Sequence, residues 1–343
     1  MPSSKPIQVI QPTGEQSLSD DTASARSSGL RNWLTFGFSL ALSAIVLYFV
    51  FQRVDARLLP QLLESQSHSL LIAAALFILL QIIFGGERWR AILSALIRDR
   101  RLPVLRIQAV YYASIFFNCL PVGTLGGDVA RVLLARRFAV PVKQLVLSVL
   151  IDRIVMVAAL VVLAALTLPA IVHPLARDAW FGSIAILTVG VAAFLLLQPV
   201  ERILGRWRHW NLVGLVLHAA AELRYIGRGR GILGLLHGML SGASAALAGY
   251  CIARSLNIAI GPVAVVAVMS LMSFAVALPI SAAGWGVREA SLVTLLGLVG
   301  VDRSAALLLS VEFGLLTTLL SLPGGLVWIA MRERPKVIRQ TGF

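Results

Sequence analysis

An apolar run of the chain is interrupted by the stretch Asn118-Cys119-Leu120-Pro121-Val122-Gly123-Thr124-Leu125-Gly126-Gly127-Asp128-Val129-Ala130-Arg131, which contains one proline, three glycines and two opposite charges. A related pattern returns 158 residues later, in Leu278-Pro279-Ile280-Ser281-Ala282-Ala283-Gly284-Trp285-Gly286-Val287-Arg288-Glu289. Both stretches place a glycine five residues after the proline and follow it with a valine and an ionised residue. Broken apolar segments at matching places in two halves are typical of transporter-like membrane sites.

The composition is that of a membrane protein. Of 343 residues, 58% are hydrophobic and only 13% are charged, whereas soluble domains are about one quarter charged. The chain is therefore predicted to be an all-α polytopic membrane protein. Its 30 Lys and Arg against 16 Asp and Glu give a basic excess that is also found in nucleic-acid-binding proteins. Here, however, the arginines are clustered between apolar runs, where they set the membrane topology and contact anionic lipid headgroups. No nucleic-acid partner is expected.

Metal and cofactor chemistry has no support in the sequence. The two cysteines, Cys119 and Cys251, lie in apolar sequence without ligand spacing, and the five histidines are scattered. Neither a Walker loop nor a nucleophile elbow is present. No metal, cofactor or catalytic residue is predicted, and an enzymatic role is disfavoured but left open.

The apolar runs divide the chain into three parts. Residues 1–30 and 336–343 are expected to form cytoplasmic tails, the first of them disordered, and residues 31–335 a single transmembrane domain. About six full spans are expected, over Trp33–Phe51, Ser69–Phe84, Leu145–Val172, Ala179–Leu197, Gly231–Ala253 and Ala305–Met331.

The segment Ile107–Leu120 is too short to cross a bilayer. Its length as a helix is about 21 Å against a hydrocarbon core of about 30 Å, and basic loops flank it on both sides. We therefore expect a re-entrant hairpin that turns at Pro121–Gly127. The second break, between Pro262–Leu278 and Glu289–Val301, would open from the opposite face, as in an inverted repeat. Three full crossings after residue 257 would also leave both termini in the cytoplasm.

The first break supplies several candidate binding residues. A helix that begins near Gly126 and Gly127 would present free backbone N–H groups to a phosphate. Asp128 and Arg131 share a helical face, so they would pair with each other, or Arg131 would bind a phosphodiester. Asn118 would line the pocket or satisfy a freed backbone carbonyl.

The second break has its own candidates. Arg288 and Glu289 are expected to begin a half-helix after Gly284-Trp285-Gly286, with Trp285 over an apolar or cationic group. The alternative is an interfacial charge pair with a tryptophan anchor.

Three further ionisable residues lie inside predicted spans: Asp152, Arg153 and Glu312. A buried charge costs about 2.5–3.5 kcal/mol at a helix centre, so such residues usually face a partner or a cavity. The first two are equally compatible with a functional or a structural role, and Glu312 favours function because it has no basic neighbour. In contrast, Glu87, Arg88 and Arg90 are expected to mark a cytoplasmic boundary.

Taken together, these motifs resemble the transmembrane-region family of lysylphosphatidylglycerol synthases. The resemblance covers roughly residues 30–335 and is carried by Glu87-Arg88-Trp89-Arg90, the stretch from Asn118 to Arg131, Asp152-Arg153 and the stretch from Pro279 to Glu289. That family includes the flippase half of the multiple peptide resistance factor and stand-alone members, some associated with hopanoid or glycolipid pathways. The aminoacyl-transferase domain of the resistance factor is expected to be absent, since the chain ends at Phe343.

The resemblance implies a multi-pass lipid flippase or transporter of the bacterial inner membrane, with both termini cytoplasmic. Its partners would be membrane lipids with an anionic or zwitterionic headgroup, of phospholipid, glycolipid or hopanoid type. The alternatives are a membrane-embedded transferase, with Asp128 or Glu289 as general base, or an accessory subunit of a lipid-modifying enzyme. An oligomer is compatible with the sequence.

Overall fold

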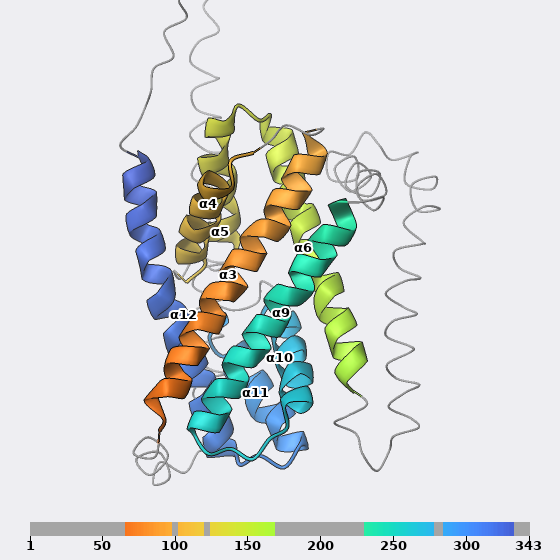
Figure 1. Ribbon diagram of the computed structural model, residues 1–343, viewed down its shortest axis with the longest axis vertical. Coiled ribbons are helices and arrows are strands. Elements are labelled where there is room, and N and C mark those ends of the chain that lie inside the picture. The colour runs from red at the N-terminus through yellow and green to blue at the C-terminus, as the bar shows by residue number, and fades with distance from the viewer. Residues whose placement is uncertain (1–65, 98–101, 120–123, 169–229, 278–283, 333–343) are drawn as a thin grey trace, which may run out of the picture.

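A computed structural model of the chain describes residues 66–97, 102–119, 124–168, 230–277 and 284–332 (Figure 1). The expected spans over Trp33–Phe51 and Ala179–Leu197 and both expected tails lie outside these ranges, as do Pro121 and Pro279.

The described residues fold into α-helices. In chain order, these helices are α3 (His68–Leu96), α4 (Val104–Asn118), α5 (Thr124–Ala135), α6 (Val142–Thr167), α9 (Arg230–Ser255), α10 (Pro262–Ala277), α11 (Val287–Leu298) and α12 (Arg303–Arg332). A 3₁₀ turn, Arg136–Phe138, follows α5.

Four of these helices, α3, α6, α9 and α12, are long and apolar enough to cross a membrane. They correspond to four of the six expected spans and make this a helical integral membrane protein. The second span is longer than predicted, because α3 continues past Phe84 to Leu96. Trp89 and Leu93 on this extension are fully buried. Their packing against neighbouring helices stabilises the additional turns.

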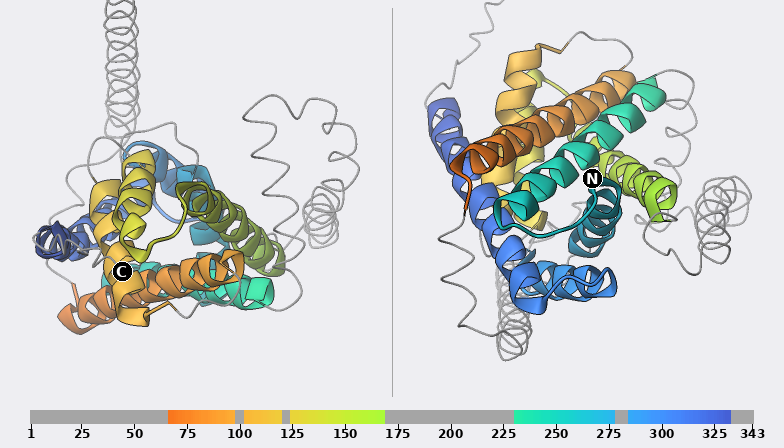
Figure 2. Two further views of the ribbon diagram at one scale, coloured as in Figure 1. Left: turned by 90° about the horizontal axis from the view of Figure 1, so that it is seen from above. Right: turned by 60° about the horizontal axis from the view of Figure 1, so that its bottom comes forward.

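The described helices form two halves with the same order: a long helix, two short helices and a second long helix. In the first half α4 packs on α5 and also reaches across to α12, and in the second half α10 packs on α11 and reaches across to α6. The leading helices, α3 and α9, lie side by side in both views (Figures 1 and 2). The pair α4–α5 occupies the upper part of Figure 1 and α10–α11 the lower part. This exchange of equivalent contacts is what an inverted repeat predicts.

Both breaks separate helices that are short. The helices on either side have 15 and 12 residues at the first break and 16 and 12 at the second. At 1.5 Å per residue, even the longest reaches only about 24 Å, less than the hydrocarbon core. The helices end at Asn118 and Ala277, close to the expected breaks, and re-entry into the bilayer stays a prediction.

Small residues bring α12 close to α4. A Cβ on Gly324 would lie 3.2 Å from the backbone carbon of Tyr112, and the Tyr112 hydroxyl donates to the Leu320 carbonyl at 2.5 Å. The first hairpin is thereby fixed against the last helix of the second half.

Candidate functional site

A cavity of about 260 Å³ lies where the two halves meet. All eight α-helices of the described ranges contribute to its wall. Its polar and charged lining residues are Gln81, Arg88, Tyr111, Asn118, Arg131, Asp152, Arg153, Ser241, Ser273, Arg288 and Thr317.

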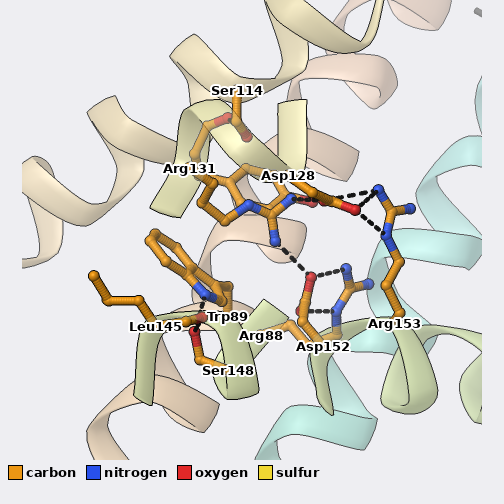
Figure 3. Close-up of polar contacts among 10 residues, drawn as sticks. Arg88, Trp89, Ser114, Asp128, Arg131, Leu145, Ser148, Asp152 and Arg153 are labelled. Carbon is orange, nitrogen blue, oxygen red and sulfur yellow. Dashed lines mark hydrogen bonds and ion pairs between the residues drawn. The ribbon is translucent and has the colours of Figure 1, made fainter. Parts of the chain in front are cut away.

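Asp152 on α6 is the centre of the charge network at this cavity. Arg88 on α3 donates to its two oxygens, from Nε at 2.7 Å and from Nη2 at 3.2 Å. Arg131 on α5 donates from Nη1 to Oδ2 at 2.8 Å (Figure 3). All three side chains are almost completely buried, with Asp152 only 1% exposed. One carboxylate therefore serves two arginines from different helices.

Aromatic rings hold the Arg131 guanidinium in place. Its Cζ lies 5.3 Å from the ring centroid of Trp89 and 4.6 Å from that of Tyr111, within cation–π range. The Trp89 indole is itself fixed, because its Nε1 donates to the Ser148 hydroxyl at 3.0 Å. The Nε of Arg131 has no hydrogen-bond partner. The network thus leaves one donor of this arginine unused.

Asp128 does not pair mainly with Arg131, as the sequence suggested. Its strong partner is Arg153, which donates to both carboxylate oxygens at 2.9–3.1 Å, while Arg131 lies 3.8 Å away (Figure 3). The expected pair within one helix is present but is the longer of the two, because α6 runs alongside α5 and offers a better-placed guanidinium. Two ion pairs, Asp128–Arg153 and Arg131–Asp152, therefore join α5 to α6.

The second break has a compact pair of its own. Glu289 is fully buried and accepts hydrogen bonds from Arg288 Nε at 3.0 Å and Nη2 at 2.7 Å, and from the backbone N–H of Gly286 at 2.6 Å. The Trp285 ring lies 4.4 Å from the Arg288 guanidinium. Gly286 has φ of +86°, a conformation that favours glycine. Because Arg288 is only 8% exposed, the pair is enclosed by protein, which favours the pocket over the interfacial alternative.

Equivalent positions in the two halves make equivalent contacts. Arg131 bonds Asp152, 21 residues later, and Glu289 accepts a hydrogen bond at 3.4 Å from Ser310, also 21 residues later. Glu289 and Ser310 each follow their counterparts by 158 positions, the same offset as that between the two prolines. The same two positions are therefore in contact in both halves, but the residues differ: the first half has an arginine and an aspartate, and the second a glutamate and a serine.

A family model described as "Lysylphosphatidylglycerol synthase TM region" matches residues 37–325. The chain belongs to this family. A search of curated proteins found no match. Family membership confirms the resemblance seen in the sequence and associates the chain with a lipid-related function in the membrane.

In this family member, the structure places five of the predicted site residues on the cavity wall: Asn118, Arg131, Asp152, Arg153 and Arg288. Three more do not line the cavity but contact residues that do: Asp128 bonds Arg153, and Glu289 and Trp285 both contact Arg288. Gly284, whose φ is +80°, lies in the turn before α11 and does not line the cavity. Glu312 also lies off the wall, where it accepts a hydrogen bond from Gln66, and its Oε2 has no partner.

Gly126 and Gly127 lie close to the start of a helix, as expected. α5 begins at Thr124, so both glycines lie within its first turn. A Cβ on Gly127 would overlap the Asn118 side chain and the Ser114 carbonyl oxygen of α4. Gly127 therefore permits close packing of the hairpin.

Arg88 is buried. The sequence had instead predicted that it lies at the cytoplasmic boundary together with Glu87 and Arg90. Those two do pair with each other, at 2.5 Å, but Arg88 points to the core. A signal was present in the helical spacing, since Ile78, Ile82, Gly85, Trp89 and Ile92 form one buried stripe that runs past Phe84. Among the described residues, no three His, Cys, Asp or Glu side chains are grouped to hold a metal.

Proposed function

We propose that the protein is an inner-membrane lipid flippase or transporter that takes a lipid headgroup into this cavity while the tail stays in the bilayer. The observation that carries the proposal is that one cavity is lined by buried arginines from both halves, Arg131 beside the first break and Arg288 beside the second. Guanidinium groups match phosphate oxygens in charge and geometry. A phospholipid-like, glycolipid or hopanoid-type headgroup would therefore be bound there.

The size of the cavity supports a headgroup as ligand. Small-molecule pockets measure about 300–1,000 Å³, and this one, at about 260 Å³, is close to the lower end. Acyl chains would need much more room, and the helices already present large apolar side chains outward, such as Leu76, Leu319 and Leu326. The tail would thus remain in lipid.

The repeat supports movement of the ligand as well as binding. Two hairpins that pack on opposite long helices make equivalent contacts, so either could loosen while the other holds the ligand. Alternating access of this kind would carry a headgroup between leaflets.

Reconstitution into liposomes tests the proposal. Protein-containing vesicles with acyl-chain-labelled phospholipid should show dithionite quenching of label from both leaflets, and empty vesicles quenching from one. Arg131→Ala should abolish this exchange without preventing membrane insertion, whereas Arg136→Ala, at an exposed position in the 3₁₀ turn that follows α5, should not. Wild-type vesicles that behave like empty ones would overturn the function, and unchanged exchange in Arg131→Ala would remove that residue's role.

The transferase alternative is disfavoured by the state of its candidate bases. A general base needs a carboxylate oxygen free to take a proton. Asp128 is held by Arg153 and Glu289 by Arg288, in each case through two or more hydrogen bonds.

Lipid extracts of a deletion strain distinguish the two functions. Loss of an enzyme would remove its lipid product, whereas loss of a flippase would leave the lipid composition unchanged. Co-purification with a lipid-modifying enzyme would instead indicate an accessory subunit.

A further inference from the structure

Helix α12 contains a proline followed by two glycines, in the stretch Ser321-Leu322-Pro323-Gly324-Gly325-Leu326. Pro323 has no backbone N–H, so the carbonyl of Leu319, four residues earlier, has no donor from its own helix. Glycine weakens a helix relative to alanine, because its backbone is the least restrained of all residues. A proline beside two glycines is therefore a point at which a long helix bends easily.

Before the proline, α12 is held by the second hairpin, α10–α11. The Ser310 hydroxyl donates to Glu289 of α11 at 3.4 Å. A Cβ on Gly314 would overlap the Arg288 guanidinium, which also belongs to α11. Residues 303–322, the body of α12, therefore pack on α11.

Beyond the proline, α12 contacts the first hairpin, α4–α5. A Cβ on Gly324 would lie 2.5 Å from the backbone carbonyl oxygen of Tyr112, so the glycine allows α4 to approach closely. Trp328 packs edge-on against Phe117 of α4, with ring centroids 5.4 Å apart. The partner of α12 thus changes from the second hairpin to the first at the Pro-Gly-Gly sequence.

The last turn of α12 is also tied to the segment that follows α5. Arg137, in the 3₁₀ turn after α5, donates from Nη1 to the backbone carbonyl of Met331. A cation at the C-terminus of a helix is favourable, because the free carbonyls there carry partial negative charge. Residues 326–332, the end of α12, are therefore attached to the first hairpin at both α4 and the turn after α5.

The corresponding helix of the first half differs at this point. With the offset of 158 residues that relates the two breaks, residues 323–325 of α12 correspond to Ala165, Leu166 and Thr167 of α6. These positions contain neither proline nor glycine, and α6 ends at Thr167. The second hairpin packs on α6 through α10. That contact has no Pro-Gly-Gly sequence, so the first hairpin is the one that moves more readily.

From these observations we propose that residues 323–325 form a hinge, about which the first hairpin swings together with the end of α12 while the body of α12 stays on the second hairpin. The inference rests on the proposed transport function, because it identifies the hairpin that opens the cavity. Cavity-lining residues lie on both sides of this movement, Ile115 and Cys119 on α4 and Phe313 and Thr317 on the body of α12. Their separation widens the cavity on the side of the first hairpin.

Distances along α12 test the hinge without any measurement of transport. In the full chain without native cysteines, spin labels at Leu315 and Ile329, both exposed, lie on either side of the hinge and about 21 Å apart along a straight helix. Labels at Leu150 and Leu166, also exposed, measure a proline-free stretch of α6 as a control. Double electron–electron resonance should give two populations for the α12 pair and one narrow population for the α6 pair. An α12 distribution as narrow as that of α6 overturns the inference.

A stiffened α12 tests the role of the hinge in transport. Pro323→Ala restores the missing N–H, so the α12 distance should become a single narrow population without a fall in Tm. Lipid exchange in liposomes should slow by at least about fivefold. Pro262→Ala is the matched control, because Pro262 is the first residue of α10, where no helical hydrogen bond is lost, and its exchange should equal that of the wild type. Exchange at the wild-type rate in Pro323→Ala would contradict the hinge.

The two measurements distinguish failure of the hinge from failure of the proposed function. Two α12 populations in a wild-type protein that exchanges no lipid would remove the flippase function and leave the hinge standing. Lipid exchange by a wild-type protein with one narrow α12 population would leave the function standing and remove the hinge.

Discussion

Arg131 Nη1 donates a hydrogen bond to Asp152 Oδ2 at 2.8 Å, across the seam between α5 and α6. Since Arg88 binds the same carboxylate from α3, this contact ties three helices of the first half together in the interior.

Asp152→Asn should strongly destabilise the protein. The substitution leaves Arg88 and Arg131 buried without their counter-charge, a change that costs about 3–5 kcal/mol when a buried pair is broken. Thermal unfolding in detergent should show a clear fall in Tm. Glu87→Gln is the matched control, because the Glu87–Arg90 pair is partly exposed and should contribute about 1 kcal/mol or less. Equal effects of the two variants would contradict a central role for Asp152.

Gly127→Ala should separate α4 from α5. The added Cβ would overlap the backbone carbonyl of Ser114, which cannot move without shifting α4. We expect a loss of about 1–3 kcal/mol. Gly297→Ala, also in a helix but with nothing within 4 Å of its Cβ, should be neutral or stabilise by up to about 1 kcal/mol. Comparing the melting temperatures of the two variants shows whether the lack of space for a Cβ or the higher helix propensity of alanine determines the effect on stability.

Arg288 and Glu289 should be energetically coupled. Arg288→Gln would leave a fully buried carboxylate unpaired, and Glu289→Gln would leave the guanidinium over Trp285 without its acceptor. Each single variant should be destabilised by about 3 kcal/mol, and the double variant should lose less than the sum. A double-mutant cycle measures the difference. Additive losses would show that the pair contributes no coupling.

The two natural cysteines report on access to the cavity. Cys119 lines the cavity at the end of α4, whereas Cys251 is buried within α9. A small maleimide should therefore modify Cys119 first, and phosphatidylglycerol should slow that reaction. Peptide mass spectrometry identifies the modified site, with Cys119→Ser as control. Faster labelling of Cys251 would contradict the assignment of the cavity.

The re-entrant topology predicts which positions share a side of the membrane. Single cysteines at Leu105 and Arg136, in a background without native cysteines, should both react with an impermeant reagent from the cytoplasmic side. Cysteines at Val263 and Leu298 should react from the opposite side. All four positions are exposed. Reaction of the first two positions from different sides would show that the segment from α4 to α5 crosses the bilayer once and does not return.

Much of the fold could be predicted from the sequence, because membrane helices are encoded locally. Long apolar runs identified α6, α9 and α12 to within a few residues, and the Pro/Gly clusters located the ends of α4 and α10. Backbone groups in lipid must bond within their own helix, so hydropathy and helix breakers are sufficient for this step. The recurrence of the break also indicated that the chain has two related halves.

Only the tertiary structure decided which charges meet. Arg88 and Asp152 are 64 residues apart in the sequence. Asp128 bonds mainly to Arg153 on another helix, although Arg131 lies only three residues away on its own helix. A buried charge takes the partner that packing brings within hydrogen-bond reach, and sequence spacing does not specify the packing of distant helices. The sequence by itself determined where the helices are and where they break. The pairing of Arg88, Arg131 and Arg153 followed from the packing of α3, α5 and α6.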